Sequence, residues 1–77
     1  MITVEVHMHG NLRRFLPEGV ATTRLELADG ALVKDVIQRL GAGHEIWVAS
    51  IGNEAVPLAT RLVDGTALDF FPHIEGG

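Results

Sequence analysis

The two glycines Gly76 and Gly77 are the residues of this sequence with the clearest chemical potential. Glycine makes up about 7% of average sequences, so a Gly-Gly ending arises by chance in about 0.5% of chains. This low frequency favours a functional role for the two glycines. Glycine has no Cβ, so it passes narrow channels and adopts backbone angles closed to other residues. A terminal carboxylate, with an ordinary pKa of about 3.5, is ionised at neutral pH and is a poor electrophile. We therefore predict that the Gly77 carboxylate reacts only after another enzyme activates it.

Residues 73–77 are predicted to be a flexible C-terminal tail that carries this carboxylate. Pro72 ends the last expected strand, and five residues follow it. Extended at about 3.3 Å each, five residues reach roughly 17 Å, enough to enter the active site of another protein. The alternative is a frayed chain end without chemistry, the usual state of termini.

Candidate partner-binding residues lie next to this tail and near the first loop. Alternation along the last strand points Leu68 and Phe70 inward and Phe71 outward. An outward aromatic beside the tail is a candidate interface anchor, although single exposed aromatics are also common on protein surfaces. The full set of partner-binding candidates is Phe71, Pro72, Ile74, Arg13 and His7.

Arg13, with its neighbour Arg14, could pair with acidic groups on a partner, or could belong to a solvated loop. His7 and His9 share one face of the first expected strand, and pairing with the last strand would bring His73 nearer. Three imidazoles can bind a metal, but no zinc-site spacing accompanies them, so we predict solvent-facing histidines and no metal site.

Composition predicts a single domain over residues 1–77 that folds by itself. Apolar residues make up 47% and charged residues 21% of the chain, an ordinary globular balance. A chain of this size buries only about 60% of the surface it exposes when unfolded, which leaves little room for a catalytic cleft. Trp47 is expected to be core or half-buried. No catalytic pair is evident, so the chain alone is not expected to be an enzyme.

The absence of cysteine excludes disulfides, a thiolate nucleophile, Cys-ligated zinc and an iron–sulfur cluster, and mildly favours a reducing compartment. The N-terminal residues lack a signal-peptide pattern, and no 18-residue apolar stretch occurs, so we expect a cytoplasmic protein without membrane contact. A net charge of −4 disfavours nucleic acid as a partner and favours a basic protein surface.

Apolar periodicity predicts five strands and one helix. Period-2 alternation indicates strands at 2–9 and 22–27, and further strands are expected at 46–51, 54–58 and 67–71. From Ala31 to Leu40, apolar residues recur at three- and four-residue spacings, which is typical of a helix; Gly41 ends it, and Asp29 is the nearest candidate N-cap. Residues 12–16 are expected to form a turn or short helical piece, and Pro57 implies an edge strand.

One helix packed on one face of a mixed sheet buries both apolar faces economically. We therefore predict an α+β, β-grasp fold of the ubiquitin-like kind.

Four segments together give the sequence its resemblance to a known family: residues 2–6, 51–54, 62–65 and 70–77. They resemble the MoaD/ThiS ubiquitin-like sulfur carriers, and the similarity spans the whole chain. The most specific part is the Phe70-Phe71-Pro72 strand end followed by the Gly-Gly tail. His73 and His7 depart from the pattern of the molybdopterin-synthase members, which often have proline and an aromatic residue there.

The resemblance implies that the C-terminal carboxylate, here that of Gly77, is adenylated and then converted to a thiocarboxylate that donates sulfur. The implied partners are a ubiquitin-activating-like adenylyltransferase, which uses ATP, and the large subunit of molybdopterin synthase; no cofactor is expected on this chain itself. Sulfur supply to thiazole, tRNA or amino-acid synthesis, attachment of Gly77 to lysine, and a plain β-grasp interaction module stay open as alternatives.

Overall fold

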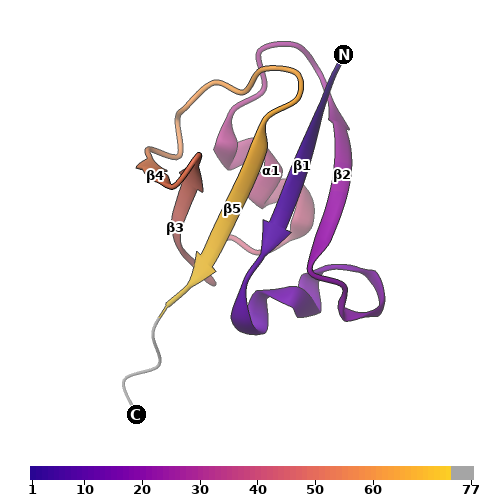
Figure 1. Ribbon diagram of the computed structural model, residues 1–77, viewed down its shortest axis with the longest axis vertical. Helices are drawn as coiled ribbons and strands as arrows, with labels where there is room; N and C mark the ends of the chain where they lie inside the picture. The colour runs from indigo at the N-terminus through magenta and orange to yellow at the C-terminus, as the bar shows by residue number, and fades with distance from the viewer. Residues whose placement is uncertain (74–77) are drawn as a thin grey trace.

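The protein is a five-stranded mixed sheet with one α-helix packed on it, as a computed structural model describing residues 1–73 shows (Figure 1). The elements in chain order are β1 (Ile2–Met8), η1 (Gly10–Phe15), η2 (Pro17–Gly19), β2 (Thr22–Leu27), α1 (Val33–Leu40), β3 (Ile46–Ile51), β4 (Glu54–Val56) and β5 (Ala67–Pro72). The sheet order is β2-β1-β5-β3-β4. The predicted β-grasp fold is confirmed, with β4, the strand just before Pro57, at the edge.

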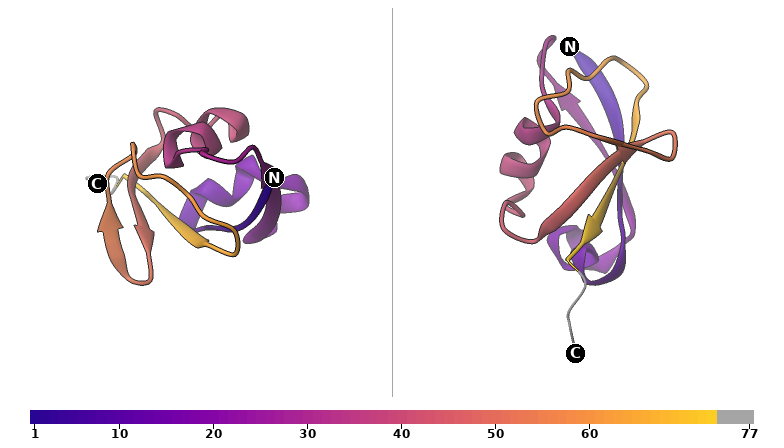
Figure 2. Two further views of the ribbon diagram at one scale, coloured as in Figure 1. Left: turned by 90° about the horizontal axis from the view of Figure 1, so that it is seen from above. Right: turned by 90° about the vertical axis from the view of Figure 1, so that its left-hand side faces the viewer.

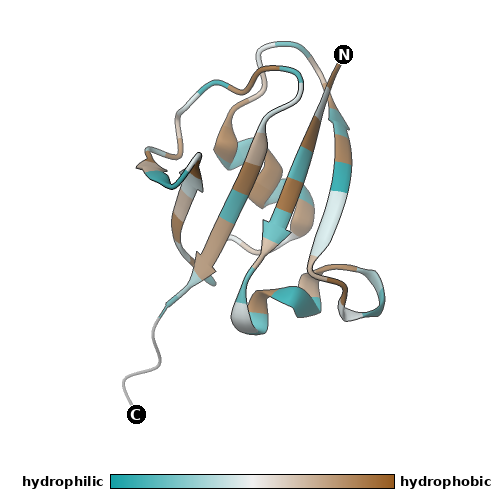
Figure 3. Ribbon diagram, in the orientation of Figure 1, coloured by the Kyte–Doolittle hydropathy of each residue, from teal (hydrophilic) through white to brown (hydrophobic). Residues whose placement is uncertain are grey.

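The core lies between α1 and one face of the sheet, as the edge-on view shows (Figure 2, right). Along β1, apolar residues that face the helix alternate with polar residues (Figure 3), and in β5 the buried Leu68 and Phe70 face the helix. The side chains with under 2% exposure include Val4, Val6, Met8, Leu12, Val33, Val36, Leu68 and Phe70. The opposite side, which we call the open face, carries the alternate residues of β1 and β5, including His7, Asp69 and Phe71.

Helix α1 begins at Val33, two residues later than predicted, and Asp29 is not its N-cap. Leu32 occupies the N-cap position, and its backbone N–H donates to the Asp35 carboxylate at 2.8 Å. The cap is thus supplied from inside the first turn rather than by a residue before it. Gly41 ends the helix in the left-handed conformation at φ 73°, as predicted.

Trp47 was expected in or near the core and is instead 60% exposed. The register of β3 on β5 shifts between Ile46, which pairs with Pro72, and Val48, which pairs with Phe71. Trp47 is the extra residue of this irregularity, and a bulge breaks the simple alternation of faces. The alternation of β3 therefore does not carry Trp47 into the core.

Strands β1 and β5 are adjacent and parallel, although their paired residues lie 62 positions apart in sequence. Val6 pairs with Leu68 and Met8 with Phe70, so both strands finish at the same end of the sheet, beside η1 (Figure 1). This pairing puts the residues that follow β1 next to the last residues of β5. Within residues 1–73, the α-helix has eight residues and no helix is long and apolar enough to cross a membrane.

Candidate functional site

The end of β5 is the place where the chain leaves the sheet towards its glycine-rich terminus. Phe70 is fully buried and faces α1, whereas Phe71 is half-buried on the open face. Strand β5 extends to Pro72, one residue further than predicted. The predicted inward direction of Leu68 and Phe70 and outward direction of Phe71 are confirmed.

His9, the residue after β1, contacts three consecutive residues of β5. Its backbone N–H donates to the Phe70 carbonyl oxygen at 3.2 Å. Its Nε2 lies 2.9 Å from Oδ1 of Asp69; an ionised carboxylate only accepts hydrogen bonds, so Nε2 carries the proton. Its ring stacks on Phe71 with centroids 4.4 Å apart and planes 9° from parallel. The stack covers one side of the Phe71 ring.

Gly10 lets the chain after β1 pack closely against Pro72. A Cβ built on Gly10 would lie 3.1 Å from Cγ of Pro72, closer than ordinary van der Waals contact, and the residue has a φ of +57°. Both features favour glycine at this position. We call His9, Gly10, Asp69, Phe71 and Pro72 together the exit cluster.

His7 lies on the same face of β1 as His9 but has different partners. Its Nε2 is 2.7 Å from Oε1 of Glu5, and its Nδ1 is 3.2 Å from the Thr22 hydroxyl. His7 pairs in register with Asp69, yet the Asp69 carboxylate is bonded to His9. In the part of the chain that the structure describes, no group of three His, Cys, Asp or Glu side chains is placed to hold a metal ion.

Both arginines of η1 contact other residues of this chain. Arg13 is exposed, and its Nε donates to the Gly19 carbonyl oxygen at 3.0 Å. Arg14 pairs with Glu45 and lies over the ring of Phe15, 4.5 Å from its centroid. A role for Arg13 in partner binding stays a prediction, and the local bond shows that the loop also uses this side chain internally.

Exposed apolar surface also lies beside the exit cluster. Val48 pairs with Phe71 across the β3–β5 ladder, and the exposed Trp47 sits between the partners of Phe71 and Pro72. Tryptophan and phenylalanine are residue types that are enriched in protein interfaces. Sequence periodicity missed this placement because the bulge is invisible without the β3–β5 register.

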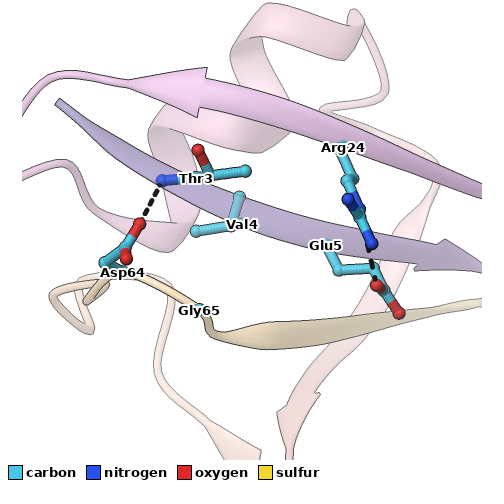
Figure 4. A pocket seen from close by; sticks show the side chains of 6 residues that line it. All are labelled: Thr3, Val4, Glu5, Arg24, Asp64 and Gly65. Carbon is cyan, nitrogen blue, oxygen red and sulfur yellow. Dashed lines mark hydrogen bonds and ion pairs between the residues drawn. The ribbon is translucent and has the colours of Figure 1, made fainter.

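A shallow hollow of about 350 Å³ lies at the other end of the sheet (Figure 4). Its lining residues are Thr3, Val4, Glu5, Arg24, Asp64 and Gly65. Asp64 accepts a hydrogen bond from the Thr3 backbone N–H at 2.8 Å, and Arg24 lies 3.9 Å from Glu5. The Asp64 bond holds the loop before β5 against the start of β1, and the Arg24–Glu5 pair joins β2 to β1, so we assign the hollow a structural role.

The predicted site residues Ile74, Gly76 and Gly77 lie outside the described residues, and so does most of the predicted tail. His73, its first residue, is exposed. The roles of His9 and Asp69 were missed by sequence reasoning. No sequence pattern identified them, because the β1–β5 register that brings His9 beside Asp69 and Phe71 is known only from the structure.

A family model described as the ThiS family matches residues 6–77. A putative molybdopterin converting factor, subunit 1, from Pyrococcus furiosus is similar in structure, with a TM-score of 0.79 and 22% identity over 96% of this chain and 100% of that one.

Two crystal structures of SAMP1, small archaeal modifier protein 1, from Haloferax volcanii are also similar. Their TM-scores are 0.76 and 0.78 at 21% and 20% identity, covering 97% and 96% of this chain and 99% and 100% of theirs. At these identities the likeness concerns the fold. A comparison with curated proteins gave no match.

Proposed function

This chain belongs to the ThiS family of ubiquitin-like sulfur carriers, and from that membership we propose that Gly77 is its working residue, adenylated and then converted to a thiocarboxylate. The observation that supports the proposal is the place where the chain leaves the sheet at the end of β5. Strand β5 finishes at Pro72 on a sheet end that presents Phe71 and Trp47, and five residues ending in Gly76-Gly77 follow. A partner that docks on this end receives the glycines at its own active site.

The proposed chemistry needs no reactive side chain from this protein. A carboxylate oxygen of Gly77 attacks the α-phosphorus of ATP in a ubiquitin-activating-like partner, and pyrophosphate leaves. A sulfur nucleophile at the oxidation level of sulfide then attacks the acyl carbonyl, forms the C–S bond and displaces AMP, which leaves Gly77 as a thiocarboxylate. Thiocarboxylate sulfur is a soft nucleophile, so the chain can deliver sulfur without any cysteine, in agreement with its composition. When an acceptor has taken the sulfur atom and the oxygen of a water molecule has taken its place at the Gly77 carbonyl carbon, the carboxylate is regenerated.

The specific pathway that we propose is molybdenum cofactor biosynthesis, with this chain as the small subunit of molybdopterin synthase. The Phe70-Phe71-Pro72 ending and the long first loop, built by η1 and η2, favour this role. The large subunit would receive the Gly77 thiocarboxylate. Sulfur supply to thiazole, thiolated tRNA or an amino acid uses the same carrier chemistry and differs only in the acceptor.

Intact mass spectrometry of the protein from its own host tests the proposal. The first question is whether the mature chain ends at Gly77, and the second is whether its mass shows one oxygen replaced by sulfur. Methionine oxidation adds nearly the same mass; Met8 is buried and Met1 is 79% exposed, so Met1 is the main source of confusion. Capture by an alkylating reagent distinguishes the thiocarboxylate.

Incubation with the host's activating enzyme, ATP and a sulfide source completes this test. Appearance of the alkylatable species supports a carrier, and its absence favours an interaction module whose glycines have no chemistry.

The printed name of SAMP1, a modifier protein, supplies a second candidate function. The adenylated Gly77 carbonyl would then be attacked by an amine, which forms an amide and releases AMP. Proteolysis after glutamate followed by mass spectrometry separates the two functions, because Glu75 precedes the two glycines and conjugation then leaves Gly-Gly remnants on lysines of other proteins.

A further inference from the structure

We propose that His9 is a positioning residue that holds Phe71 and the end of β5 in the orientation recognised by the activating enzyme. The inference rests on the proposed function and adds a residue to it. His9 touches neither ATP nor Gly77 in this proposal; it acts through Phe71 and Pro72.

The first argument is that His9 is fixed from three directions. Its backbone bonds to Phe70, its ring nitrogen bonds to Asp69, and its ring face lies on Phe71. An isolated exposed imidazole would sample several rotamers, whereas this ring is held in one. Because the three partners are consecutive residues of β5, His9 holds the residue that follows β1 against the last residues of β5.

The second argument is that the Asp69 carboxylate bonds to His9 and not to His7, the histidine directly opposite it. In the parallel ladder His7, not His9, is the register partner of Asp69. Nevertheless the Asp69 carboxylate bonds to His9, while His7 bonds to Glu5 on its own strand. This arrangement keeps an acceptor for His9 on β5 and so keeps its ring above Phe71.

The third argument is what the stack does to Phe71. An interface anchor that is already held in its bound conformation avoids the entropy cost of being ordered on binding. Phe71 is packed on one side by His9 and has Val48 as its cross-strand partner on the other. Beyond it, Gly10 and Pro72 fix where the chain leaves the sheet. Loss of the His9 ring should therefore weaken recognition of the carrier without altering the chemistry at Gly77.

The experiment is steady-state ATP–pyrophosphate exchange by the host's activating enzyme, with the carrier as the varied substrate. His9→Ala should raise KM for the carrier roughly three- to tenfold and leave kcat within about twofold, as expected for loss of one pre-ordered side chain. His9→Phe keeps the stack and loses the bond to Asp69; His9→Gln keeps a hydrogen-bond donor and loses the stack. Rescue of KM by His9→Phe but not by His9→Gln identifies the stack as the positioning contact.

The matched control is Glu54→Ala, an exposed residue on β4 at the opposite end of the β3–β5 ladder, which should leave KM unchanged. Thermal unfolding confirms that each variant is folded, and Trp47, the only tryptophan, gives a fluorescence signal for docking.

Equal KM values for wild type and His9→Ala would overturn the inference, as would a loss confined to kcat. Absence of exchange with the wild-type carrier would instead overturn the proposed function and the inference with it.

Discussion

Replacing Gly10 by alanine should disturb both the stability of the domain and the exit of its C-terminus. Gly10 has a φ of +57°, and an added Cβ would lie 3.1 Å from Cγ of Pro72. The left-handed backbone costs an alanine about 1–2 kcal/mol. The contact with Pro72 adds about 1 kcal/mol for overpacking, because the proline ring is not the flexible end of a side chain. We therefore expect Gly10→Ala to lower the free energy of unfolding by about 2–3 kcal/mol.

Gly52→Ala is the matched control for this substitution. Gly52 has a nearly identical φ of +60°, with no heavy atom within 4 Å of a built Cβ. It lies in the turn between β3 and β4, away from the exit cluster. It should therefore show the backbone cost alone, about 1–2 kcal/mol. The difference between the two variants isolates the contact with Pro72.

Urea denaturation measures the stabilities, and ATP–pyrophosphate exchange with the host's activating enzyme measures the function. A shift of Pro72 redirects the residues that follow it, so Gly10→Ala should lose roughly three- to tenfold in kcat/KM, while Gly52→Ala retains the wild-type value. If both variants lose the same stability and the same activity, the reasoning about the contact between Gly10 and Pro72 is refuted.

Three further substitutions test a core residue, the helix cap and a surface ion pair. Phe70→Ala removes a fully buried ring and should lower the free energy of unfolding in urea by about 3–5 kcal/mol, a large part of the roughly 4–12 kcal/mol typical of this size; a loss below about 1 kcal/mol would contradict its place in the core. Asp35→Ala removes the acceptor of the Leu32 N–H and should cost about 0.5–1 kcal/mol in thermal unfolding; no change would argue against that cap. Arg14→Ala breaks the exposed pair with Glu45 and should cost less than about 1 kcal/mol, an effect that shrinks in high salt; a larger, salt-independent loss would mean that the side chain acts mainly by packing.

Local patterns in the sequence were sufficient to predict most elements and the class of fold. Alternation along Ile2–Met8 and the apolar stripe of α1 are local patterns, set by the two-residue and 3.6-residue periods of the backbone. Gly41 marked the end of the helix for an equally local reason, its left-handed φ. The direction of Phe70 and Phe71 followed from alternation on one strand. The chemical role of Gly76 and Gly77 was inferred from the sequence and stays a prediction, because both residues lie outside the described part of the chain.

The residues that gather where β5 ends could not be predicted, because their contacts depend on how distant strands pair. His9 meets Asp69 and Phe71 because β1 and β5 pair in parallel, and a register between strands about 60 residues apart is set by the packing of the whole sheet. The exposure of Trp47 depends on a register shift between β3 and β5, which no pattern within β3 reveals. Gly10 could be recognised as a turn residue from its type, but its contact with Pro72 required both strand ends to be placed in space.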